Sequence, residues 1–119
     1  MIEGTRIKTE LANTVGRWAY MLCECFVQIP GGGLRAIFSY ECAACGNTNL
    51  RFTHTLENVD TGQQIQVGIE CACVLMEDYE LPHLAENETK RKERWRREKY
   101  HKPGRCITTI EDLENRGKL

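Results

Sequence analysis

The sequence predicts a small α+β domain, in which a β-hairpin and a short helix lie between an amphipathic helix near the N-terminus and a charged helix near the C-terminus. Three observations lead to this expectation. A C-x-x-C pair, Cys42 and Cys45, precedes two segments with strand character, and Cys71 follows them. Apolar residues recur at helical spacing over residues 9–28. Charged residues dominate a further helical segment over residues 84–100.

The length of the chain limits the number of domains. With 119 residues, of which 41% are hydrophobic, it has the size of one modest domain. We therefore expect a single domain, with a helix and strand in residues 1–39, a central module in residues 40–80 and a charged helical tail in residues 81–119. No apolar run reaches the roughly 18 residues that cross a bilayer, and MIEGTRIKTE lacks the features of a signal peptide. The expectation is a soluble, cytoplasmic protein.

The first predicted element is an amphipathic helix over residues 9–28. Its apolar residues recur at steps of three and four, which places them on one face of a helix. These residues are Leu11, Val15, Trp18, Leu22, Cys25 and Ile29. The sequence IPGGGL at residues 29–34 ends this helix, because proline cannot continue it and three glycines favour an open turn. Residues 34–41, LRAIFSYE, then have strand character.

A β-hairpin is predicted next, with strands over residues 51–57 and 63–69. The turn between them, NVDTG, consists of residues that tolerate turn conformations. Because side chains alternate along a strand, one face of each strand is apolar, and these two faces share the buried side. His54 therefore points inward. The inward row is Phe52, His54 and Leu56 in the first strand, and Ile65, Val67 and Ile69 in the second.

Helices follow the hairpin. A short helix is expected over residues 71–79, and after an interruption by a proline, a highly charged helix over residues 84–100 that stops before a Pro-Gly pair. Thr108 and Glu111 have the spacing of a capping box, which predicts a final helical turn or two over residues 110–115.

The cysteines favour metal binding over disulfides, since seven is an odd number and nothing directs the chain to an oxidising compartment. The C-x-x-C spacing aims the sulfurs of Cys42 and Cys45 at one point, while Gly46 takes the left-handed conformation that the turn needs. Cys71 stands at the predicted start of a helix, where the helix dipole favours a thiolate. A knuckle, a hairpin and a cysteine at a helix start, in this order, predict a zinc-stapled, treble-clef-like module.

Two residues compete for the fourth position of this zinc site. Strand parity places His54 on the face that leads to Cys71, so imidazole and thiolate can converge. Cys73 would require a C-x-C pair to present both sulfurs as the chain bends into a helix. A third interpretation makes His54 a hydrogen-bonded core residue. We predict a structural Zn²⁺ whose four ligands fill its coordination and leave no place for a catalytic water. The predicted ligands are Cys42, Cys45, His54 and Cys71.

The same residues carry a resemblance. C-x-x-C-G at residues 42–46, an aromatic-x-His at Phe52 and His54, and Val-Gly-x-x-Cys-Ala at residues 67–72 resemble a small zinc-finger-like domain of poorly characterised bacterial and phage proteins. The resemblance covers about residues 41–76. It implies metal ligands at the positions of Cys42, Cys45, His54 and Cys71, and it implies no activity.

The charged helix suggests a partner. Residues 88–105 contain nine of the sixteen basic residues and only three of the seventeen acidic ones. Lysine and arginine interleaved with aromatic residues suit phosphate contacts and stacking on unpaired bases. We therefore predict a non-enzymatic protein that binds DNA or RNA through this helix. The predicted contact residues are Lys90, Arg91, Lys92, Arg94, Trp95, Arg96, Arg97, Lys99 and Tyr100.

Other interpretations remain open. The charged helix could simply present a solvated face. Its basic surface and the acidic body of the chain could instead grip a host protein, as a phage or mobile-element inhibitor or adaptor would. A metal-dependent nuclease is least favoured, because the helix after the hairpin offers only acidic residues as further ligands. No membrane and no small-molecule substrate is expected. Cys25 lies on the apolar stripe and is expected to act as a small hydrophobic residue, whereas Cys23 lies off that stripe. Cys106 is isolated, with no histidine pattern or second cysteine nearby to suggest catalysis.

Overall fold

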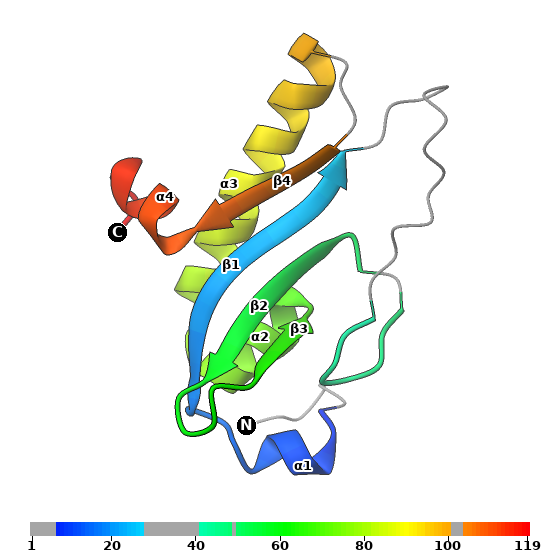
Figure 1. Ribbon diagram of the computed structural model, residues 1–119, viewed down its shortest axis with the longest axis vertical. Coiled ribbons are helices and arrows are strands. Elements are labelled where there is room, and N and C mark those ends of the chain that lie inside the picture. The colour runs from blue at the N-terminus through cyan, green and yellow to red at the C-terminus, as the bar shows by residue number, and fades with distance from the viewer. Residues whose placement is uncertain (1–6, 28–40, 49, 101–103) are drawn as a thin grey trace.

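An antiparallel four-stranded sheet in the order β3-β2-β1-β4 organises the protein. The computed structural model describes residues 7–27, 41–48, 50–100 and 104–119. Helices α2 and α3 cover one face of the sheet (Figure 1), which confirms the prediction of a small α+β domain. The strands are β1 (Trp18–Val27), β2 (Phe52–Asn58), β3 (Gln64–Val67) and β4 (Gly104–Thr109). The helices are α1 (Thr9–Ala12), α2 (Ile69–Met76), α3 (Glu80–Trp95) with its π-helical extension η1 (Arg96–Tyr100), and α4 (Ile110–Asn115).

The predicted amphipathic helix over residues 9–28 is wrong. Only Thr9–Ala12 is helical, and the second half of the segment is β1, which pairs with β2 on one side and with β4 on the other. A strand with partners on both edges gains two ladders of hydrogen bonds, and this outweighs the local helical preference of its Ala, Met, Leu and Glu residues. The predicted turn at residues 29–34 lies outside the described residues, and so does the predicted strand that follows it, apart from Glu41.

A β-bulge explains why β1 resembles a helix in sequence. The register of β1 against β2 shifts at Met21, which has no partner of its own. The inward-facing residues are Trp18 and Tyr20 before the bulge, and Cys23 and Cys25 after it. An extra residue in a strand reverses the alternation of its faces. Trp18 and Cys25, which are seven residues apart, consequently share the inward face, as they would on a helix.

The predicted hairpin is confirmed. In β2 and β3, His54 pairs with Val67 and Leu56 pairs with Ile65. The side chains of His54, Leu56 and Val67 are completely buried, as strand parity predicts. The turn begins at Asn58, whose side-chain oxygen accepts hydrogen bonds from the backbone N–H groups of Asp60 and Thr61.

The two helices after the hairpin are confirmed, with earlier starts than predicted. α2 begins at Ile69 and ends where Glu77 takes a left-handed conformation with φ 53°. α3 begins at Glu80, because Pro82 lies in its first turn, where the missing N–H costs nothing. The carboxylate of Asp78 accepts hydrogen bonds from the backbone of Glu80 and its successor, which satisfies two N–H groups at the start of α3.

Strand β4 is absent from the sequence prediction. It runs along the free edge of β1 and leads directly into α4, which covers the helical segment predicted for residues 110–115. The capping box of α4 is formed by Thr109 and Asp112, one residue later than the predicted pair Thr108 and Glu111. The Thr109 hydroxyl accepts from the Asp112 N–H at 3.2 Å, and the Asp112 carboxylate accepts from the Thr109 N–H at 3.1 Å.

The hydrophobic core lies between the sheet and the helices. α3 packs on β1 and β4, whereas α2 packs on β2 and β1. In the described part of the chain, no helix combines the length and the apolar character that a membrane span needs. The buried side chains that meet in this core include Trp18, Tyr20, Cys23, Leu56, Val67, Leu75, Ala85 and Leu113.

Candidate metal centre and charged helix

Cys42 and Cys45 lie in a tight turn, the knuckle (residues 42–46). The carbonyl of Cys42 accepts a hydrogen bond from the N–H of Gly46 at 2.8 Å, and the Cys42 N–H donates to the carbonyl of Asn47 at 2.8 Å. Gly46 has φ 80°, which confirms the predicted left-handed conformation. Open space surrounds the position of a Cβ at Gly46, so the backbone conformation alone requires glycine there.

Backbone hydrogen bonds fasten the knuckle to the hairpin. The N–H of Ala43 donates to the carbonyl of Gln66 in β3 at 2.9 Å. β3 ends one residue after Gln66, and the N–H of the following residue, Gly68, donates a hydrogen bond to Sγ of Cys42 at 3.4 Å. A Cβ on Gly68 would lie only 2.9 Å from a methyl group of Leu50, so this approach is close. The chain then enters α2, and its third residue is Cys71, as the sequence predicts.

The knuckle and the start of α2 bring three sulfurs together. The Sγ atoms of Cys42, Cys45 and Cys71 all lie within 4.8 Å of one another. Thiolates bound tetrahedrally to one zinc at about 2.3 Å are about 3.8 Å apart, so a small contraction would suffice. Cys42 and Cys71 are buried and Cys45 is half-buried, and all three are free of disulfides. These three cysteines could therefore hold one metal ion.

The thiols of this cluster are electrostatically unequal. A hydrogen bond from the Cys71 thiol holds the pKa of Cys42 well below its usual range, and the backbone N–H groups of Gly68, Cys45 and Ala44 act in the same direction. The same shared hydrogen bond raises the pKa of Cys71, as do its burial and the nearby sulfurs. The sulfurs of Cys42 and Cys71 thus share one hydrogen bond. A bound metal cation would hold all three cysteines as thiolates, because metal binding displaces thiol protons.

The structure does not bring His54 into this cluster. Its Nδ1 lies 2.7 Å from the hydroxyl of Tyr20, and its Nε2 lies 3.0 Å from the carboxylate of Glu86. Both ring nitrogens are engaged, so no lone pair faces the sulfurs. The alternation of side chains along β2 correctly predicts that His54 points inward. At His54, however, the inner face of the sheet meets α3, whereas the knuckle lies at the end of β3. His54 is therefore placed as the hydrogen-bonded core histidine of the third interpretation.

Cys73 does not join the cluster either. It is buried on α2, with its Sγ 3.7 Å from Nδ1 of His83 and 3.9 Å from the carbonyl of Tyr79. Two residues along a helix rotate a side chain by about 200°, so Cys73 faces away from Cys71. Among the described residues, the candidate metal centre has three protein ligands, Cys42, Cys45 and Cys71.

Most of the cations in the first part of the charged helix are in ion pairs. Four of the predicted contact residues each pair with a carboxylate of α3 or α4, so less positive charge reaches the solvent than the sequence suggests. Surface pairs of this kind contribute roughly 0–1 kcal/mol each to stability. The pairs are Lys90 with Glu86 at 3.3 Å, Arg91 with Glu88 at 2.6 Å, Lys92 with Asp112 at 3.1 Å, and Arg97 with Glu93 at 2.6 Å.

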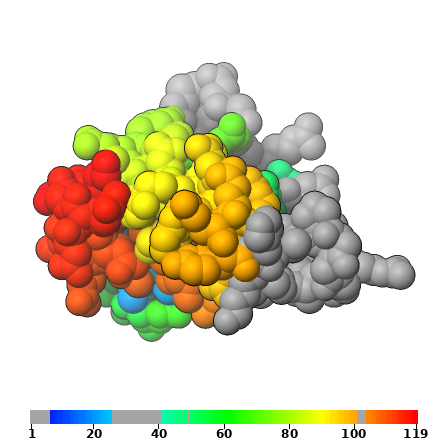
Figure 2. Space-filling view, turned by 90° about the horizontal axis from the view of Figure 1, so that it is seen from above, coloured from blue at the N-terminus to red at the C-terminus, as the bar shows by residue number. Residues whose placement is uncertain are grey.

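The end of the helix is different. Trp95 and Tyr100 are 52% and 59% exposed, and their rings meet edge to face with centroids 4.8 Å apart. The side chains of Arg94 and Lys99 are exposed there and form no ion pair with any residue that the structure describes. Figure 2 shows this end of the helix, coloured yellow to orange, facing the viewer beside the red α4.

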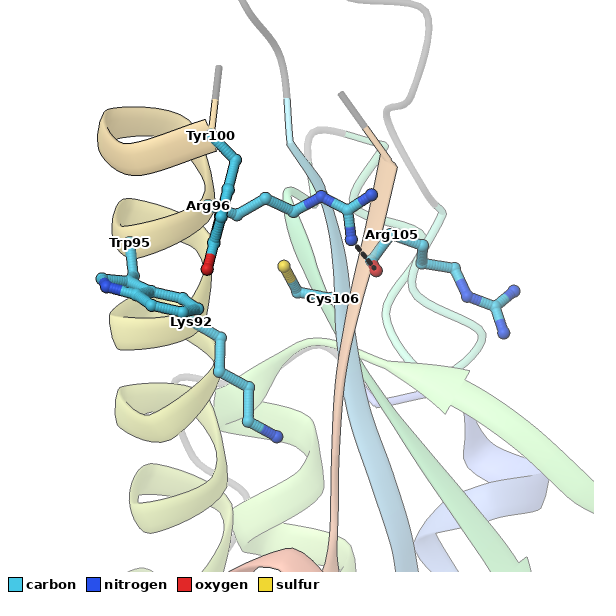
Figure 3. A pocket seen from close by; sticks show the side chains of 6 residues that line it. All are labelled: Lys92, Trp95, Arg96, Tyr100, Arg105 and Cys106. Atoms are coloured by element: carbon cyan, nitrogen blue, oxygen red, sulfur yellow. Dashed lines mark hydrogen bonds between the residues drawn. The ribbon is translucent and has the colours of Figure 1, made fainter. Parts of the chain in front are cut away.

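Strand β4 adds residues that the sequence analysis did not include in any site. β4 lies opposite the end of the helix, and the thiol of Cys106 faces the helix, whereas the Arg105 side chain points away from it (Figure 3). The signal for this strand is its run of Cys, Ile and two threonines, since β-branched residues favour strands. Their proximity to the helix depends on the pairing of β4 with β1, which no local pattern indicates.

Comparisons of this chain with protein-family models, with curated proteins and with solved structures find no match. The treble-clef-like classification therefore stays a prediction. The three clustered cysteines and the exposed aromatic end of the charged helix are the two features from which a function can be argued.

Proposed function

We propose that the protein is a non-enzymatic zinc protein, in which Cys42, Cys45 and Cys71 bind a structural Zn²⁺ and the end of α3 binds nucleic acid. The observation that supports the zinc site is the meeting of three sulfurs within 4.8 Å. Soft thiolate donors in a compact set select zinc among the abundant divalent ions. The three cysteines leave a fourth coordination position, but no carboxylate or imidazole among the described residues joins the cluster to act as a general base there, which favours a structural role.

A zinc ion at this site would tie the knuckle to the start of α2. The hairpin lies between these two segments, so the ion would close a loop that contains β2 and β3. Zinc binding contributes on the order of 10 kcal/mol or more to the folding of small modules, which is comparable to the whole stability of a small domain. The position of α3, which packs against α2, would then depend on the ion.

The exposed pair of Trp95 and Tyr100 supports the nucleic-acid part of the proposal. Unpaired bases stack on such rings with about 1–3 kcal/mol per base, whatever their sequence. Arg94 and Lys99, which directly precede Trp95 and Tyr100 in the chain, are exposed and can contact phosphates. Four of the other cations are paired with the protein's own carboxylates, so the contact surface is short and little sequence readout is expected.

A salt titration tests this proposal. Fluorescence anisotropy measures the binding of zinc-loaded protein to a labelled random single strand of about 20 nucleotides, with salt raised from about 50 to 200 mM. Neutralising two or three phosphates predicts that log K falls against log salt with a slope of about −1.4 to −2. Absence of binding even at about 50 mM salt would remove the nucleic-acid function and leave the zinc site untouched.

The same ion pairs favour a second candidate function. A charged surface with both signs interleaved suits a protein partner, such as the host protein expected of an inhibitor or adaptor, better than it suits a polyanion. If no oligonucleotide binds, a pull-down from host extract compared with an Arg94→Glu, Lys99→Glu double variant tests this alternative. A partner that binds the double variant equally well would contradict it.

A further inference from the structure

Two cysteines outside the metal centre face each other across the sheet. Cys25 in β1 is the register partner of Cys106 in β4. Their side chains are 0% and 6% exposed, and they form a small buried cluster against which Phe52 packs. Both are free of disulfides. The pairing of β1 with β4 therefore brings together two thiols that lie far apart in the sequence.

The strand register sets the distance between these two residues. Residues directly opposite each other in an antiparallel pair have Cα atoms about 4.5 or 5.5 Å apart. Both values fall within the range of about 4.4–6.8 Å that a disulfide spans. The side chains of Cys25 and Cys106 also share one cluster, so they lie on the same face of the sheet. A bond between the two sulfurs therefore needs little movement of the backbone.

Cys23 does not compete for Cys106. It is completely buried on the same face of β1, but its register partner is Thr108. Cys23 and Cys106 are therefore diagonal neighbours, and such neighbours are about 7–8 Å apart, which is beyond the reach of a disulfide. The register thus selects Cys25 as the partner of Cys106.

The thiol of Cys106 borders a pocket between the end of α3 and β4. Figure 3 shows its sulfur pointing from the strand toward the helix. The pocket has a volume of about 350 Å³. A water molecule takes about 30 Å³ of liquid volume, so a small hydroperoxide can enter. Burial raises the pKa of Cys25 to about 12 and also raises the pKa of Cys106. Neither residue is a thiolate at neutral pH, so oxidation is expected over hours rather than seconds.

We propose that Cys25 and Cys106 are a redox-sensitive pair, which hydrogen peroxide or another small hydroperoxide oxidises to a disulfide between β1 and β4. The sulfur of Cys106 attacks one peroxide oxygen, the O–O bond breaks, and a sulfenic acid forms as water leaves. The sulfur of Cys25 then attacks the sulfur of Cys106, and the S–O bond breaks. The hydroxyl group leaves with the proton of the Cys25 thiol as a second water. Two thiols lose two electrons to one hydrogen peroxide, which yields one disulfide and two waters.

The disulfide fastens the last strand of the sheet to its neighbour. β4 is the strand at one edge of the sheet and pairs with β1. A covalent link between these strands closes a long loop of the chain, and this removes conformational entropy from the unfolded state. The oxidised protein should therefore melt about 5–15 °C higher than the same protein without the link.

Peptide mapping of the oxidised protein tests the proposal. Reduced, zinc-loaded protein is incubated for several hours with millimolar hydrogen peroxide and excess zinc. The remaining thiols are then alkylated, and a non-reducing digest is analysed by mass spectrometry. We expect a linked pair of peptides that contain Cys25 and Cys106, and dithiothreitol should separate them. Cys25→Ser and Cys106→Ser should each lose this linked pair. Cys23→Ser is the matched control, because Cys23 is equally buried on the same strand, and it should keep the pair. Circular dichroism checks that each variant is folded.

Three outcomes would overturn the proposal. The first is a wild-type map in which Cys106 is a sulfinic acid and Cys25 a free thiol, since the two sulfurs then do not meet. The second is loss of the linked pair in Cys23→Ser. The third is a linked wild type that melts no higher than Cys25→Ser treated in the same way. Zinc content is measured on the same samples, so failure of the cysteine pair is distinguished from failure of the metal centre.

Discussion

Replacing Cys45 with alanine should remove the metal and, with it, the stability of the hairpin module. Cys45 is only half-buried, so the lost packing of one thiol accounts for about 1 kcal/mol at most. Loss of a zinc site removes on the order of 10 kcal/mol, against a total of about 5–15 kcal/mol for a small domain. A role of Cys45 in packing alone and a role as a zinc ligand therefore predict changes in the unfolding free energy that differ roughly tenfold.

Metal analysis and thermal unfolding distinguish the packing role of Cys45 from its role as a zinc ligand. Purified wild-type protein should contain one zinc per chain and lose its folding transition on chelation, whereas Cys45→Ala should contain none and be unfolded or molten near room temperature. Cys73→Ala provides the matched control, because Cys73 lies in the same module but outside the cluster. It should keep its zinc and lose about 1–3 kcal/mol from a buried contact. A metal-free wild type that melts cooperatively and ignores chelators would refute the reasoning, and so would loss of zinc from Cys73→Ala.

Three further predictions concern the fold. Tyr20→Phe leaves the buried Nδ1 of His54 without the hydroxyl 2.7 Å away, so urea denaturation should show a loss of about 1–3 kcal/mol at unchanged zinc content; a neutral effect would contradict the assigned hydrogen bond. Thr109→Ala removes the cap of α4 and should cost about 1 kcal/mol by the same assay, whereas Thr109→Ser should be near neutral. The hydrogen bond from Arg91 lowers the pKa of Glu88 from its ordinary 4.5, so the stability that Glu88 contributes is present above pH 4.5 and lost as pH falls through its lower folded pKa. The melting temperature of the wild type should therefore decline more steeply below pH 4.5 than that of Glu88→Gln, and parallel curves would contradict this assignment.

The parts of the fold that follow from the sequence are those set by neighbours along the chain. The knuckle needs a glycine directly after its second cysteine, and Gly46 has the required positive φ. The hairpin has its turn residues between two alternating segments, and α4 has its cap within four residues. Each is a local rule, so the sequence predicts each to within a few residues.

The parts that do not follow depend on distant partners. The bulge at Met21 gives β1 a residue pattern that resembles a helix. Only the pairing of β1 with strands on both of its edges identifies it as a strand. The chemistry of His54 suits either a metal or a hydrogen-bond network, and the choice is made by Glu86, which lies 32 residues away on α3. No spacing rule connects those positions. The sequence therefore predicts the orientation of His54 correctly and predicts its partners wrongly.

The order of the strands has a consequence for biosynthesis. β1 lies in the interior of the sheet, yet one of its two neighbours, β4, is made about 80 residues after it. A ribosome-bound chain can close the hairpin against β1 but must leave the other edge of β1 open until β4 has been made. An open edge of this kind attracts strands of other chains. Premature termination just before β4 would therefore release a fragment with an unpaired strand edge, which is prone to aggregate or to be degraded.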